Sequence, residues 1–132
     1  MNWEPFVKSS WELVMESEGR TQIYLQEELE CYLVFMMART FTDVSIPVDI
    51  VALQFANAKT KNDYRRIGDS CLFVDAWDVK RAKLVSKEYY KDMGKIAYSF
   101  ASVKDRPADE LMENVSQNFE FLSKVLRGLK TF

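Results

Sequence analysis

Asp69 is the carboxylate whose neighbours most suggest ligand chemistry. It lies in the stretch RRIGDSCLF, residues 65–73, three residues after Arg66 and within an apolar pattern. A carboxylate in such a place keeps its charge only beside a partner. Arg65 is one helical turn away, and further partners come from a tyrosine-rich stretch: Tyr89, Tyr90 and Tyr98. Two interpretations follow: a structural Asp–Arg or Asp–Tyr pair, or a tyrosine-lined pocket in which arginines hold a carboxylate or phosphate ligand.

Other kinds of chemistry are excluded by composition. The chain has no histidine, which removes His-containing zinc or iron sites, imidazole triads and proton transfer by imidazole. Gly68 stands alone beside a carboxylate, whereas a phosphate loop needs several glycines. Carboxylates at helical spacing (27 with 30, 88 with 92) are similar to those of all-α Mg²⁺-dependent nucleotide pyrophosphatases, but the E-E-x-x-E arrangement and its partner motif are missing. We expect no metal, cofactor or catalytic residue.

Gly68 and Gly94 interrupt two helical patterns. A glycine inside a helix costs about 1 kcal/mol relative to alanine, so each position needs a compensating reason. The lack of a Cβ lets another backbone approach closely. The sequence therefore predicts that the helices around residues 68 and 94 cross near these glycines, backbone against backbone.

Helical periodicity recurs along the chain, whose 4 glycines and 3 prolines give few breaks. This predicts an all-α, single-domain bundle of five or six helices over residues 1–132. Thr40 to Pro47 is expected to be a connection, with Ser45 as an N-cap. The first three predicted helices cover about residues 4–17, residues 22 or 25 to 40, and residues 48–55. The fourth runs from a cap at residue 62 or 63 to residue 77, and the fifth from a cap at Ser86 to residue 100. The last begins at residues 105–107 and ends at residue 129.

The last predicted helix has the most regular apolar pattern. Its apolar residues alternate steps of three and four: Met112, Val115, Phe119, Leu122, Leu126 and Leu129. The pattern is shorter than the three or four heptads that indicate an autonomous coiled coil. Packing within the bundle is favoured over a seam with a protein partner or a homodimer through residues 107–130.

Charge and hydropathy limit the kinds of partner and the cellular location that we expect for this protein. The net charge is −2 and the pI is about 5.3, whereas nucleic-acid binders are usually basic. Residues 1–30 are acidic and residues 59–95 basic, so they could dock on each other or on a partner. No apolar run is long enough to span a membrane and no signal peptide is evident. Cys31 and Cys71 lie in apolar patterns and predict two buried free thiols. We expect a cytoplasmic protein that contacts neither nucleic acid nor membrane.

Two stretches together resemble a known family. GDSCLFVDAW and YYKDMGKIAYSFAS resemble the pattern G-D-x-x-L-F followed by Y-Y-x-x-M-G-x-x-A-Y-x-x-L-A. This pattern occurs in a family of bacterial helical proteins with no established activity. Phe100 stands where that family has leucine. The helix around residues 30–38 is similar to the family's Y-L-x-x-L-L-A helix. The resemblance implies a shared architecture and a bacterial cytoplasmic origin, and no activity.

Two functions remain open at this stage. The first is a non-catalytic helical interaction or regulatory module, with Trp3 or Trp77 as surface anchors unless they pack in the core. The second is a small-molecule binding protein or enzyme that holds an anionic ligand around Asp69, Arg65 and the Tyr89–Tyr90 pair.

Overall fold

The computed structural model describes residues 4–42, 51–77, 86–104 and 108–129, and these form seven α-helices without strands. This confirms the all-α prediction, with more helices than the five or six expected. The helices are α1 (Glu4–Thr21), α2 (Glu27–Thr42), α3 (Val51–Asn57), α4 (Lys61–Trp77), α5 (Lys87–Val103), α6 (Glu110–Gln117) and α7 (Phe119–Arg127). Helix α2 runs to Thr42, so the first residues of the connection predicted from Thr40 to Pro47 are helical instead. The rest of that connection with its cap at Ser45, the start at 105–107 and the anchor Trp3 lie outside the described residues.

Helix α1 continues past residue 17, where the sequence predicted its end, to Thr21. Gly19 is helical and a Cβ there would meet nothing within 4 Å, so this glycine marks no close contact. The last turn is held by α7 instead, because Arg20 donates to the carbonyl oxygen of Gly128 at 2.7 Å and Ser17 to that of Val125. The chain turns at Gln22, whose φ is 59°, and α2 begins later than the sequence predicted.

The start of α4 is fixed by a reciprocal cap rather than by Asn62 or Asp63 alone. The hydroxyl of Thr60 accepts the backbone N–H of Asp63 at 3.1 Å, and the Asp63 carboxylate accepts the N–H of Thr60 at 3.1 Å. This is a capping box, which satisfies two otherwise unpaired donors. The prediction that Ser86 caps α5 is confirmed. Helix α4 extends to Trp77, the last described residue of its segment.

The prediction of a single last helix is wrong, because the helix is interrupted at Asn118. The backbone there leaves the helical region at φ −105° and ψ 17°. The Asn118 amide donates to the carbonyl oxygen of Asn114 at 2.9 Å, which is the way that asparagine competes with a helix. The apolar stripe nevertheless stays on one side through the break, and its six residues are at most 7% exposed.

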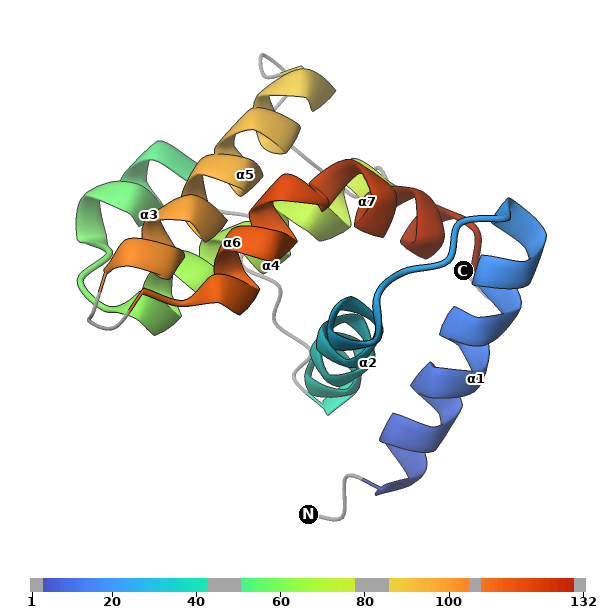
Figure 1. Ribbon diagram of the computed structural model, residues 1–132. Coiled ribbons are helices and arrows are strands. Elements are labelled where there is room, and N and C mark those ends of the chain that lie inside the picture. The colour runs from blue at the N-terminus through green and yellow to red at the C-terminus, as the bar shows by residue number, and fades with distance from the viewer. Residues whose placement is uncertain (1–3, 43–50, 78–85, 105–107, 130–132) are drawn as a thin grey trace.

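One hydrophobic core joins the helices. The most extensive helix contact is between α4 and α5. Helix α6 packs on α5, and α7 packs on α4. Helix α1 packs on α2 and on α7. Figure 1 shows α3 and α1 at opposite sides, with α2 between α1 and the other helices. The apolar stripe from Met112 to Leu129 lies in this core, while Phe121 on the same segment is 50% exposed. A protein partner or homodimer contact through residues 107–130 stays a prediction. Among the described residues no helix has the length and apolar character needed to cross a membrane.

Trp77 is a core anchor and not a surface one. Its ring stacks on Phe73 with 4.8 Å between centroids, and its Nε1 donates to the carbonyl oxygen of Leu126 at 2.8 Å. This indole therefore ties α4 to α7.

Candidate functional site

Asp69 on α4 accepts bonds from two tyrosines and lies beside two arginines. The hydroxyl of Tyr98 on α5 donates to Oδ1 at 2.7 Å, and the hydroxyl of Tyr32 on α2 donates to the same oxygen. On the other side, the guanidinium groups of Arg65 and Arg39 each lie 3.5 Å from Oδ2. We call these five residues the Asp69 cluster. It joins three helices at one carboxylate that is 13% exposed.

Burial keeps the two phenols of the cluster protonated. It is the largest cause that raises the pKa of Tyr98 and of Tyr32 well above the usual value for tyrosine, and the negative charge of Asp69 adds to it. Both hydroxyls therefore act as donors to the carboxylate. Asp69 has its charge compensated and both oxygens engaged, which is the condition for a nearly buried charge to be tolerated. The geometry matches the structural interpretation better than that of a carboxylate facing a ligand.

The structure brings together some of the residues that the sequence singled out. Arg65 and Tyr98 reach Asp69, as described above. Arg66 is exposed. Tyr89 and Tyr90 contact each other edge to face at 5.7 Å. They precede Tyr98 by more than two turns of α5, about 12 Å along its axis, so they do not line the surroundings of Asp69.

Tyr32 and Arg39 are the members of the cluster that the sequence reasoning missed. They lie seven residues apart and so share one face of α2. A tyrosine and an arginine at this spacing, on either side of the apolar run from Leu33 to Ala38, were the available signal. Nothing local to α2 indicates which carboxylate they meet.

Both predicted crossing glycines lie where α4 and α5 meet, but side chains fill the space that they leave. A Cβ on Gly68 would come within 2.6–2.8 Å of the Tyr98 ring. A Cβ on Gly94 would lie 2.5 Å from the Phe119 ring and 2.9 Å from the Cβ of Cys71. The nearest atoms are thus side-chain atoms rather than the backbone contact that the sequence suggested. Gly68 makes room for the ring whose hydroxyl binds Asp69.

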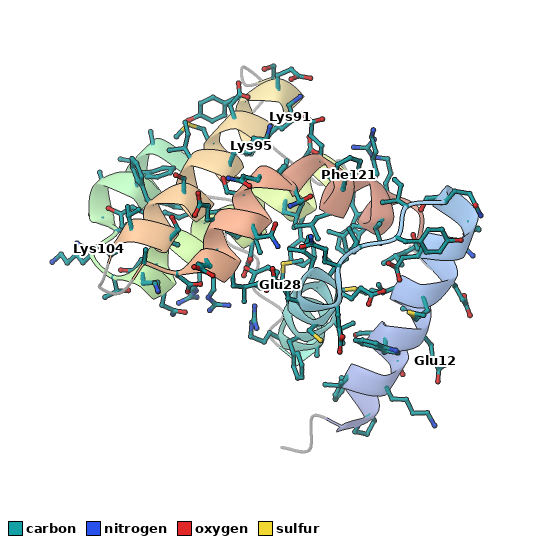
Figure 2. All side chains as sticks on the ribbon, in the orientation of Figure 1. Glu12, Glu28, Lys91, Lys95, Lys104 and Phe121 are labelled. Carbon is teal, nitrogen blue, oxygen red and sulfur yellow. The ribbon has the colours of Figure 1, made fainter. Side chains whose placement is uncertain are left out.

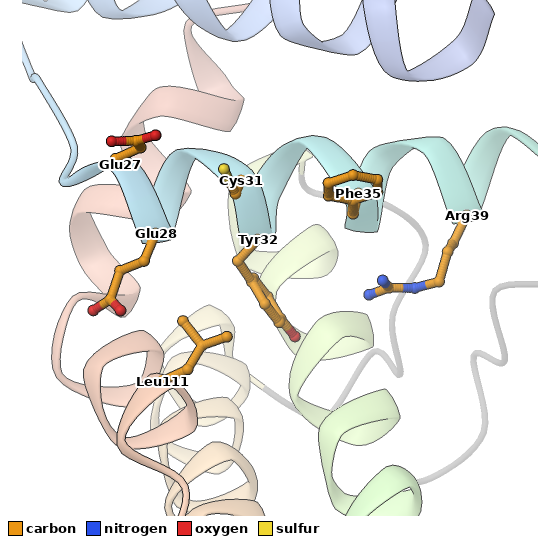
Figure 3. A pocket seen from close by; sticks show the side chains of 7 residues that line it. All are labelled: Glu27, Glu28, Cys31, Tyr32, Phe35, Arg39 and Leu111. Atoms are coloured by element: carbon orange, nitrogen blue, oxygen red, sulfur yellow. The ribbon is translucent and has the colours of Figure 1, made fainter. Parts of the chain in front are cut away.

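An open groove of about 650 Å³ borders the Asp69 cluster. Its lining comes from α2 and from one residue of α6: Glu27, Glu28, Cys31, Tyr32, Phe35, Arg39 and Leu111 (Figure 3). Tyr32 and Arg39 belong to both the groove and the cluster. Phe35 is 51% exposed, a large apolar surface in an otherwise sheltered helix. We call this feature the α2 groove.

The charges of the α2 groove are separated along its length. Glu27 and Glu28 stand at the first turn of α2 and Arg39 at its last turn, with apolar side chains between them. These ends lie about 16–18 Å apart along the helix axis. Cys31 faces this groove and is only partly buried, whereas Cys71 is buried and both are free thiols. Burial first, and the charge of Asp75 second, raise the pKa of Cys71 to about 12.

A second acidic feature links α1 to α2. Glu18 is 2% exposed; its Oε2 accepts the N–H of Leu25 at 2.8 Å, and its Oε1 is buried without a hydrogen-bond donor among the described residues. Glu30 lies within hydrogen-bonding reach of Glu18, and burial followed by this neighbour raises the pKa of Glu30 to about 7. Two carboxyl groups can hydrogen-bond only when one of them holds a proton, so the nearby Glu18 favours the protonated form of Glu30.

Lys91 and Lys95 of α5 form ion pairs. Lys91 lies 3.0 Å from Glu88 and 3.4 Å from Glu120, and Lys95 lies 3.5 Å from Glu120. Figure 2 shows the two lysines on α5. The basic middle of the chain thus meets an acid of α7. No group of three or more His, Cys, Asp or Glu side chains in the described part of the chain is placed to hold a metal ion.

Comparison with protein family models, with curated proteins and with solved structures finds no match to this chain. The resemblance to the bacterial helical family therefore stays a prediction.

Proposed function

We propose that this protein is a non-catalytic interaction module that binds an amphipathic helix in the α2 groove. The observation that carries the proposal is the groove itself: an open, mainly apolar groove whose lining includes the half-exposed Phe35. Helical modules commonly receive a partner helix in this way, with anchors spaced at i, i+3, i+4 and i+7.

The charged ends of the groove favour one orientation of the partner helix. A helix antiparallel to α2 places its C-terminal turn beside Glu27 and Glu28 and its N-terminal turn beside Arg39. Basic residues are favourable in the last turn of a helix and acidic residues in the first. The groove therefore suits a helix with that ordinary charge order, with an apolar stripe facing Phe35 and Leu111.

An anionic small molecule at Asp69 has weaker support. Both Asp69 oxygens already have partners within the protein. Tyr89 and Tyr90, which were expected to line such a pocket, lie elsewhere on α5. The α2 groove is also open along its length, whereas small-molecule sites enclose most of their ligand.

The test is titration with a designed amphipathic helix of about 18 residues, which spans the length of α2. One peptide carries Glu in its first turn, a leucine stripe and Lys in its last turn, and a second peptide has the charges exchanged. We expect amide NMR shifts confined to the α2 groove and tighter binding of the first peptide. Shifts elsewhere, no shifts at a dilution where the protein is monomeric, or equal binding of both peptides would contradict the proposal.

A matched pair of variants sharpens this experiment. Phe35→Ala removes the exposed anchor of the groove. Phe121→Ala removes an equally exposed phenylalanine on α7, since the two are 51% and 50% exposed. Peptide affinity should fall at least tenfold in the first variant and stay unchanged in the second. Equal loss in both would mean that the peptide binds exposed aromatic surface without preference for the groove.

A further inference from the structure

The exposed face of α2 is complementary to itself. Its first turn is acidic, its last turn carries Arg39, and Phe35 stands between them as a half-exposed apolar group. Glu28, Phe35 and Arg39 share one face of the helix, because seven and eleven residues correspond to about two and three turns. This is the charge order and the apolar anchor that the α2 groove requires of its partner helix.

A two-fold axis between Leu33 and Val34 brings these groups together in one register. With two α2 helices antiparallel, Glu28 of each copy faces Arg39 of the other. The same register sets Phe35 of each copy opposite Tyr32 of the other. Both matches follow from one axis position, as a self-complementary contact between identical surfaces requires.

Phe35 fits this arrangement as a knob. Opposite its ring, the second copy presents a hole formed by Glu28, Cys31, Tyr32 and Phe35, the four positions that surround a knob in paired helices. Cys31, Tyr32 and Phe35 line the groove, so the ring of each copy enters the groove of the other. Burial of two half-exposed phenylalanines supplies the apolar part of the contact.

The charges at the two ends add specificity. Glu28 has no ion-pair partner among the described residues; its carboxylate accepts a hydrogen bond from the amide of Asn114. Arg39 keeps its contact with Asp69 and, with five N–H donors on a planar group, reaches Glu28 of the second copy from a side chain that is 38% exposed.

We propose that the α2 groove is occupied by α2 of a second copy of this chain, in a two-fold symmetric antiparallel pair with Phe35 in each groove. This inference rests on the proposed function, since it names the helix that the groove receives. A single helix pair lies at the small end of specific interfaces, so the dimer dissociates on dilution.

Charge exchange between copies tests the pairing. The two variants are Glu28→Arg and Arg39→Glu, each measured alone and in an equal mixture by sedimentation velocity over a range of concentrations. Each variant alone sets like charges against each other at both ends and should be monomeric where the wild type dimerises. In the mixture both ends regain opposite charges, and a heterodimer should form. A purely structural effect of either substitution predicts no such recovery.

Arg39→Glu also sets a negative charge beside Asp69, so a second pair of variants guards against misfolding. Phe35→Glu should abolish dimerisation, and Phe121→Glu, at an equally exposed position on α7, should leave it intact. Melting followed by circular dichroism verifies that both variants fold. A wild type that stays monomeric at several hundred micromolar, or a dimer that Phe35→Glu leaves unchanged, overturns the inference.

The two proposals fail separately. If the wild type is monomeric and the designed peptide still binds in the groove, another protein's helix is the occupant and only the self-pairing is wrong. If neither the peptide nor a second copy binds, the proposed function fails as well.

Discussion

Substituting the two interface glycines with alanine separates close packing from helix propensity. Gly68, Gly94 and Gly19 are all helical, so an alanine at any of them gains up to about 1 kcal/mol of intrinsic helix propensity. Their surroundings differ. A Cβ at residue 19 meets nothing within 4 Å, whereas at residues 68 and 94 it would lie 2.5–2.9 Å from buried side chains.

The cost at residues 68 and 94 follows from that overlap. Carbon atoms pack at about 3.5–4.0 Å, so the neighbouring group must move by roughly 1 Å. Tyr98 and Phe119 are both 0% exposed, and Tyr98 is also held by its bond to Asp69. Overpacking of a core typically costs about 1–3 kcal/mol. We expect Gly68→Ala and Gly94→Ala to be destabilising by about that amount, and Gly19→Ala to be neutral or stabilising by up to about 1 kcal/mol.

Urea denaturation measures the effect, with an unchanged m-value showing that stability alone has changed. For a chain of this size, 1 kcal/mol corresponds to roughly 3–5 °C in melting temperature. Combining Gly68→Ala with Tyr98→Leu removes the ring that the new methyl meets, so the two costs should not add. If Gly68→Ala proves as stable as Gly19→Ala, or the double variant is strictly additive, the close packing described for α4 and α5 is wrong.

Three further predictions concern other features of the site. The pKa of Glu30 is raised to about 7 from an ordinary 4.5. Its contribution to the free energy of unfolding is therefore complete below about pH 4.5 and is lost as the pH rises through 7. Because Glu30 is only partly buried, we expect this contribution to be about 1 kcal/mol. Glu30→Gln should remove this part of the pH dependence of unfolding. An unchanged pH profile would show that Glu30 and Glu18 do not share a proton. Tyr98→Phe deletes one donor to Asp69 and should cost about 1.5–3 kcal/mol in denaturant unfolding, while a cost below about 0.5 kcal/mol would show that the bond is unimportant. A disulfide reagent should modify Cys31 in the native protein and Cys71 only after unfolding, since burial raises the pKa of Cys71 to about 12 and the thiolate is the reactive form; equal rates in the native state would contradict this.

Much of the helical framework could be predicted from the sequence because its signals are local. The cap at Ser86 and the buried stripe from Met112 to Leu129 depend on residues only a few positions apart. The errors lie where contacts from distant segments intervene, or where one side chain competes with the helix. Thus α1 runs through residues 18–20 because α7 holds its last turn, and Asn118 breaks the final helix.

The candidate site could be predicted only in part, because its residues come from helices far apart in the chain. The sequence identified Asp69 and its neighbour Arg65, which are one turn apart on the same helix. Tyr32 and Arg39 joined them only through the way α2 crosses α4. The sequence likewise indicated that Gly68 needed a reason, and the packing of α5 supplied it as the Tyr98 ring. Periodicity decides which face of a helix is buried, but the crossing of the helices decides which side chains meet there, and that depends on the whole core at once.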